Sequence, residues 1–218
     1  MIPLLHDFTD ATVLVFGGGP VGARKARRFA REATVIVVSP TFTDRDFGPS
    51  ERVRAAPGPT EVAAWIDRTS PALVVAATDD RDVNDAVDEA ARARDVLVNR
   101  ADRSGGRDFG SVVVPATVRD DPVVVSVATG GRAPALSRYL RRELEESISG
   151  AGSMATFCAE LRRELKSRNV SSSRRQEIVT DAVNSPAVWT ALRSGTSNDR
   201  QVIEDVLDEE LSTGGEST

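Results

Sequence analysis

Short apolar runs alternate with amphipathic stretches through the first hundred residues of the chain. The runs are apolar throughout, which is typical of strands in a parallel sheet that is covered on both faces. These candidate strands are residues 13–16, 34–38, 72–77 and 96–98, and residues 52–55, which include two arginines, are a weaker candidate. Between them, apolar side chains recur at helical spacing. The candidate helices are residues 21–32, 61–68 and 83–94. The pattern predicts an α/β fold, with a Rossmann-type parallel sheet over residues 1–114.

The pattern changes after residue 111. Two β-rich stretches, 112–116 and 123–128, flank a turn signal at Asp120-Asp121-Pro122. Pro134 suits the first turn of a helix over 134–146. Four candidate helices follow. The first has Met154, Phe157, Leu161 and Leu165 on one face, and the second is capped within 171–173 and ends at Asn184. The other two are residues 186–192 and 199–211. We expect an α+β region at 115–150 and a small all-helical domain at 151–218, with a disordered tail from 213.

Composition excludes several classes of function. Hydrophobic residues make up 40% of the 218 residues, and no stretch approaches the roughly 20 apolar residues of a membrane span. The start of the chain lacks the pattern of a secretory signal. Cys158 and His6 are the only residues of their types, so we expect no internal disulfide, no metal site and a cytoplasmic location. A net charge of −5 without a long basic run disfavours nucleic-acid binding.

A glycine motif follows the first predicted strand. Gly17, Gly19 and Gly22 fit the spacing G-x-G-x-x-G, and they lie between a strand and a helix, as a dinucleotide site requires. The first glycine permits a tight turn, the second lets the backbone approach a pyrophosphate, and the third lets the helix pack on the sheet. Free N–H groups at the helix start would then point at the phosphates. The alternative is a purely structural glycine turn.

The second strand lacks the acidic residue that usually binds the ribose hydroxyls in such domains. Ser39, Pro40 and Thr41 stand there instead, and their hydroxyls either bond the cofactor or only cap a turn. No arginine adjoins Ser39 in the chain to favour the extra phosphate of NADP, so we expect NAD. Thr78 and Asp79 end another strand on the same edge of the sheet and should flank the dinucleotide.

Several segments together resemble one family, and they occur in its order and spacing. They are residues 17–26, 76–80 with Val83-Asn84, 99–102, Phe109 with Pro115, and 129–136 leading into 140–145. From about residue 2 to 165 the chain is similar to precorrin-2 dehydrogenase, the N-terminal module of bacterial siroheme synthase. The resemblance implies NAD-dependent oxidation of precorrin-2 to sirohydrochlorin. It also implies a homodimer held by region 115–150, and NAD contacts from Pro20, Val21, Pro40 and Thr41.

The resemblance also suggests which residues carry the chemistry. Asp102 matches the aspartate that the family places in its active site, and it follows a strand at the edge where ligands bind. We interpret Asp102 as the general base that takes a proton from the substrate; the alternative is a solvated loop acid. Precorrin-2 carries eight carboxylates, which arginine binds well. Candidate substrate-binding residues are Arg100, Arg103, Arg107, Arg132 and Arg138, together with Thr129 and Gly130 in a stretch where family members often have serine.

Two other functions are considered beside the dehydrogenase. Some family members also insert Fe²⁺ into sirohydrochlorin, and Asp102 could accept the pyrrole protons released in that step. Rossmann domains with a smaller module also serve as non-catalytic NAD sensors, which fold alone does not distinguish from enzymes. Segments 99–102 and 129–136 favour the enzyme because a sensor does not need them. Neighbouring genes for tetrapyrrole enzymes or for ion transport would separate the two classes.

Overall fold

The computed structural model describes residues 3–103, 111–194, 201–206 and 208. The chain divides into two compact units, Met1–Val114 and Pro115–Thr218. The division of the second unit into 115–150 and 151–218 stays a prediction.

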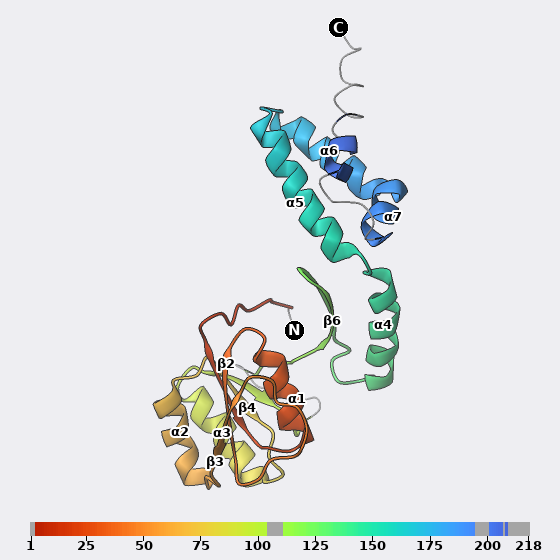
Figure 1. Ribbon diagram of the computed structural model, residues 1–218. Coiled ribbons are helices and arrows are strands. Elements are labelled where there is room, and N and C mark those ends of the chain that lie inside the picture. The colour runs from red at the N-terminus through yellow and green to blue at the C-terminus, as the bar shows by residue number, and fades with distance from the viewer. Residues whose placement is uncertain (1–2, 104–110, 195–200, 207, 209–218) are drawn as a thin grey trace. The chain divides into compact units, whose positions relative to one another are not determined.

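The first unit contains a five-stranded parallel sheet in the order β3-β2-β1-β4-β5 (Figure 1). Its strands are β1 Thr12–Phe16, β2 Thr34–Ser39, β3 Glu51–Arg54, β4 Leu73–Ala76 and β5 Leu97–Arg100. The helices that connect them are α1 Pro20–Phe29, the 3₁₀ turn η1 Pro59–Glu61, α2 Val62–Thr69 and α3 Arg81–Arg92. This strand order is that of a Rossmann-type domain, so the predicted fold class is confirmed.

Helices cover both faces of the sheet, as the uninterrupted apolar strands predict. Successive side chains of β1 point to opposite faces. Leu14 and Phe16 join the core under α2 and α3, whereas Val13 and Val15 join the core under α1. Figure 1 shows α2 and α3 on one side of the strands and α1 on the other. A hydrophobic core on each face of the sheet therefore fixes the strands whose carboxyl ends form the site.

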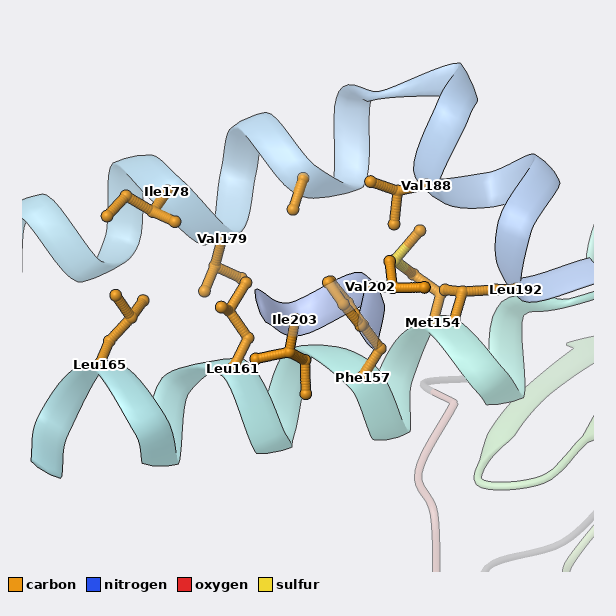
Figure 2. Close-up of a cluster of buried hydrophobic side chains, with 11 residues drawn as sticks. Met154, Phe157, Leu161, Leu165, Ile178, Val179, Val188, Leu192, Val202 and Ile203 are labelled. Atoms are coloured by element: carbon orange, nitrogen blue, oxygen red, sulfur yellow. The ribbon is translucent and has the colours of Figure 1, made fainter. Parts of the chain in front are cut away.

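The second unit begins with an antiparallel hairpin and continues with helices. The hairpin is β6 Ala116–Asp120 paired with β7 Val123–Val127, and α4 Pro134–Ser147 packs against it. The remaining helices are α5 Ala151–Ser167, α6 Ser172–Asn184 and α7 Pro186–Ser194, with a further helical stretch at 201–206. Figure 2 shows the predicted apolar face of α5 meeting side chains of α6, α7 and this last stretch. Ser171 caps α6 by accepting a hydrogen bond from the Arg174 amide, as predicted.

The predicted strand at 112–116 is wrong. The valines at its start belong to the first unit, where the Val112 amide donates to the Val98 carbonyl over 2.8 Å. Pro115 has no N–H to donate to a ladder, and the hairpin strand starts only at Ala116. Of the predicted helix at 199–211, residues 201–206 and 208 are helical. Its other residues and the tail from 213 lie outside the described part of the chain.

Candidate active site

A cleft of about 920 Å³ lies at the carboxyl ends of β1, β2 and β4. Strand order reverses between β1 and β4, and ligands of open α/β sheets bind at such a reversal. The cleft is lined by nearly all the predicted cofactor-binding residues: Gly17, Gly19, Pro20, Val21, Ser39, Pro40, Thr41, Thr78 and Asp79. Gly22 is the exception. The sequence did not suggest Ala56, Pro57 and Gly58, which also line it and follow β3.

The three glycines of the motif play different roles in the structure. A side chain on Gly17, whose φ is +117°, would collide with the Ala77 carbonyl. A side chain on Gly22 would collide with the Gly17 carbonyl, so both glycines are required by the packing of the protein itself. At Gly19, no heavy atom of the described residues other than its neighbours in the chain lies within 4 Å of the position that Cβ would take. Only Gly19 therefore keeps space free at the cleft.

The start of α1 is suited to an anion. Gly19 is its N-cap and provides no side-chain hydrogen bond, and the first turn contains Pro20 and no acidic residue. The first N–H groups of a helix have no partner within the helix, and the helix dipole favours a negative charge beside them. The free space at Gly19 and the uncapped amides thus fit the pyrophosphate of a dinucleotide.

The glycine loop is bonded to the loop that follows β2. The Gly17 amide donates to the Val38 carbonyl over 3.0 Å, and the Thr43 amide donates to the Gly18 carbonyl over 2.9 Å. A side chain on Gly18 would collide with the Thr41 carbonyl, so a third glycine is needed here. Gly18 lines the cleft but was not among the predicted site residues. Its signal was the run of three glycines, Gly17 to Gly19, whose middle position the motif G-x-G-x-x-G leaves open.

Asn84 holds the loop after β4 in place. Its side chain is buried, and Oδ1 accepts from the Thr78 amide at 3.2 Å and from Thr78 Oγ1 at 2.8 Å. Nδ2 of Asn84 donates to the Thr78 carbonyl at 3.0 Å. Asp80 caps α3, since its carboxylate accepts from the amides of Asp82 and Val83. Asp79 is exposed at the cleft, between these two anchored residues.

Asp102 forms a two-pronged ion pair with Arg100. Nε and Nη2 of Arg100 donate to Oδ1 and Oδ2 of Asp102 at 2.9 and 2.7 Å. The Arg100 side chain is only 6% exposed, and its Nη1 also donates to Asp85 at 2.7 Å. These bonds lower the pKa of Asp102, mainly through the hydrogen bond from Arg100, and raise the pKa of Arg100. Asp102 is therefore ionised throughout the neutral range.

The two arginines predicted to bind substrate near Asp102 bind carboxylates of the protein. Arg100 pairs with Asp102 and Asp85, and Nη2 of Arg103 also donates to Asp85 at 2.7 Å. A substrate carboxylate would have to compete with these partners or join them. Among the described residues that line the cleft, Asp102 does not occur. Arg107 lies outside the described residues.

The other predicted substrate-binding residues belong to the second unit. Thr129 Oγ1 lies 2.9 Å from Ser137 Oγ and donates to the Ala133 carbonyl at 3.3 Å. Gly130, with φ of +63°, and Arg132 are exposed in the turn before α4. Arg138 is exposed on α4 itself. These residues thus share one loop and the start of α4.

Comparison with known proteins places the chain in a family. A family model described as putative NAD(P)-binding matches residues 4–116. The precorrin-2 dehydrogenase of Methanosarcina barkeri is 31% identical over 197 residues, which are 86% of this chain and 85% of that protein. The chain belongs to the precorrin-2 dehydrogenase family. Its glycine motif and its cleft lie in the matched NAD(P)-binding region.

Other members of the precorrin-2 dehydrogenase family extend the comparison. The siroheme synthase of Pseudomonas fluorescens is 33% identical over 205 residues, which cover 92% of this chain but 41% of that protein. The chain thus spans about two fifths of the length of this relative. The solved structure of SirC, precorrin-2 dehydrogenase, has a TM-score of 0.71, 23% identity, and covers 95% of this chain and 100% of its own. This likeness supports the fold.

Two kinds of feature are absent from the described part of the chain. Over the described residues, no helix is both long and apolar enough to cross a membrane. In the same part of the chain, no group of three or more His, Cys, Asp or Glu side chains is arranged to hold a metal ion.

Proposed function

We propose that this chain oxidises precorrin-2 to sirohydrochlorin with NAD as the electron acceptor. The observation that carries the proposal is the floor of the cleft, where the space beside Gly19 is free and the start of α1 has no side-chain cap. Membership of the precorrin-2 dehydrogenase family supports the choice of substrate, because the relative from M. barkeri bears that name.

The backbone does most of the cofactor binding in this proposal. The amides of Val21 and Gly22 bind the pyrophosphate at the start of α1. Ser39 and Thr41 hydrogen-bond the adenosine ribose at the end of β2, and Thr78 and Asp79 flank the dinucleotide after β4. NAD, when bound, accepts a hydride from the macrocycle. The protein contributes position and charge.

Asp102 takes the proton in the proposed reaction. Precorrin-2 loses two hydrogens, one as a hydride to the nicotinamide and one as a proton to a carboxylate oxygen of Asp102. The pairing with Arg100 makes Asp102 a weak base. A weak base suffices, because a macrocycle that has lost a hydride is a cation and releases a proton readily. Arg103, Arg132, Thr129 and Gly130 are retained as proposed contacts to the substrate, and Arg100 acts mainly by holding Asp102.

The test is the appearance of NADH from precorrin-2 and NAD. Asp102→Asn keeps the shape of the side chain but removes the basic oxygen, so turnover should fall at least about a hundredfold, the lower end of general-base effects. NAD affinity by calorimetry should stay within twofold. Asp95→Asn is a matched control. Asp95 has φ of +54°, which asparagine tolerates, and it precedes β5, at the end of the strands opposite to Asp102. Full turnover in Asp102→Asn would remove Asp102 from the mechanism.

The proposal extends to the assembly and the location of the protein. A homodimer that uses region 115–150 is supported by the exposed apolar side chains of Leu136 and Tyr139, which are 48% and 52% exposed on one side of α4. A cytoplasmic location is supported by the single cysteine, which is typical of a reducing compartment. Light scattering of the purified chain tests the dimer. Insertion of Fe²⁺ into sirohydrochlorin stays a prediction, and incubation with both substrates against a protein-free blank tests it.

A further inference from the structure

A second cavity of about 550 Å³ adjoins the cofactor cleft in the first unit. It is lined by Phe42, Thr43, Asp44, Arg45, Arg52 and Arg54, and is called the arginine pocket below. Phe42 and Thr43 also line the cleft, so the two cavities share a wall. The shared residues belong to the loop after β2, where the proposed adenosine ribose lies.

Pairing of β2 with β3 brings the arginines to this place. Arg54 lies directly opposite Ser39 in the parallel ladder, and the Ala55 amide donates to the Ser39 carbonyl over 3.2 Å. Since side chains alternate along a strand, Arg52 and Arg54 share one face of β3 while Val53 packs into the core on the other. No arginine adjoins Ser39 in the sequence, but the pairing of β2 with β3 makes Arg54 its neighbour.

The charges of the arginine pocket are not balanced. It contains three guanidinium groups and one carboxylate, that of Asp44. Within the described residues, Arg45, Arg52 and Arg54 form no ion pair. The guanidinium of Arg52 lies over the rings of Phe42 and Phe47, at 6.0 and 5.8 Å from their centres. The pocket therefore has positive charge available for an anion from outside the chain.

The position of the arginine pocket indicates which anion. In Rossmann-type domains, an acid at the end of the second strand binds the ribose 2′-hydroxyl of NAD, and an arginine nearby accommodates the 2′-phosphate of NADP. Here the acid is replaced by Ser39, and Arg54 lies beside it. We propose that the arginine pocket binds the 2′-phosphate of NADP, so that the cleft takes NADP within tenfold of its affinity for NAD, or more tightly. This inference rests on the dinucleotide site of the proposed function.

Calorimetry on the full chain with NAD and NADP tests the inference without any substrate. The double variant Arg45→Ala/Arg54→Ala should weaken NADP binding by about tenfold or more, since each arginine provides a charge-assisted bond, and should leave NAD binding within twofold. Arg31→Ala is the matched control, because this exposed arginine precedes β2 at the amino ends of the strands, away from the cleft. Raising the salt concentration should weaken NADP more than NAD, because exposed charges are screened. The fragment 2′,5′-ADP should lose affinity in the double variant and at high salt as NADP does, and the fragment 5′-AMP should respond as NAD does.

Three results would overturn the inference. They are wild-type binding of NADP more than tenfold weaker than that of NAD, equal weakening of both cofactors in the double variant, and binding of neither cofactor. The last result would also remove the proposed dinucleotide site. If both cofactors bind as expected but precorrin-2 is not oxidised, the proposed function fails while the assignment of the arginine pocket stands.

Discussion

Replacing Gly19 with alanine separates a glycine needed by a ligand from one needed by the fold. Gly19 has φ of −78° and ψ of −177°, an extended conformation that alanine adopts without strain. Apart from its neighbours in the chain, its added Cβ would meet no heavy atom of the described residues within 4 Å. We therefore expect the free protein to fold normally, with a methyl group standing where the pyrophosphate should approach.

The magnitudes follow from the same geometry. Alanine at a compatible position gains about 0.4–1 kcal/mol from the unfolded chain, and it loses up to about 1 kcal/mol as a poorer N-cap. The free energy of unfolding should therefore change by less than about 1 kcal/mol, or about 2–4 °C in melting temperature. NAD affinity should fall at least about tenfold, which is about 1.4 kcal/mol. Gly22→Ala, by contrast, should act on stability: it should lower the free energy of unfolding by about 1–3 kcal/mol, because its Cβ collides with the Gly17 carbonyl.

The assay combines urea unfolding with calorimetric titration of NAD for both variants and the wild type. If Gly19→Ala binds NAD like the wild type, the cofactor does not approach this part of the backbone. If Gly19→Ala instead loses several kcal/mol of stability, the space beside it is filled in solution. Either result refutes the assignment of the cleft floor.

Three further expectations concern other parts of the chain. Asn84→Ala should cost about 1–3 kcal/mol in urea unfolding, because Thr78 loses partners for its amide, hydroxyl and carbonyl groups; an unchanged midpoint would show that the loop is held otherwise. The lowered pKa of Asp102 means that its pair with Arg100 stabilises the fold above pH ~4 and is lost as pH falls through the folded-state pKa. The stability difference between wild type and Asp102→Asn should thus shrink from pH 6 to pH 3, and a constant difference would contradict this. Leu161→Ala, at a fully buried position, should cost about 2–5 kcal/mol by thermal unfolding while NAD affinity stays within twofold; a parallel loss of affinity would show that the units depend on each other.

The Rossmann-type sheet and most of the cleft could be predicted from the sequence because they depend on local signals. Mostly apolar strands, glycines at fixed spacing and short turns each act over a few residues. The start of the hairpin could not be predicted in this way. A valine run at 112–114 suits either a strand of the hairpin or a segment beside β5, and the bond from Val112 to Val98 decides between them.

The features that the sequence did not reveal depend on pairing between distant segments. Arg54 is far from Ser39 along the chain and becomes its neighbour only through the β2–β3 register. The pairing of Arg100 with Asp102 and Asp85 likewise joins the end of β5 to α3. From the sequence, Arg100 is one arginine among many, and its buried position is set by tertiary packing.

The bond between the Thr43 amide and the Gly18 carbonyl has a consequence for the kinetics of cofactor uptake. Because the loops after β1 and β2 are joined before any ligand arrives, the entropy of ordering them is lost during folding and not during association. Encounter with the dinucleotide should then follow simple second-order kinetics, with a rate proportional to concentration and no plateau from a slow rearrangement.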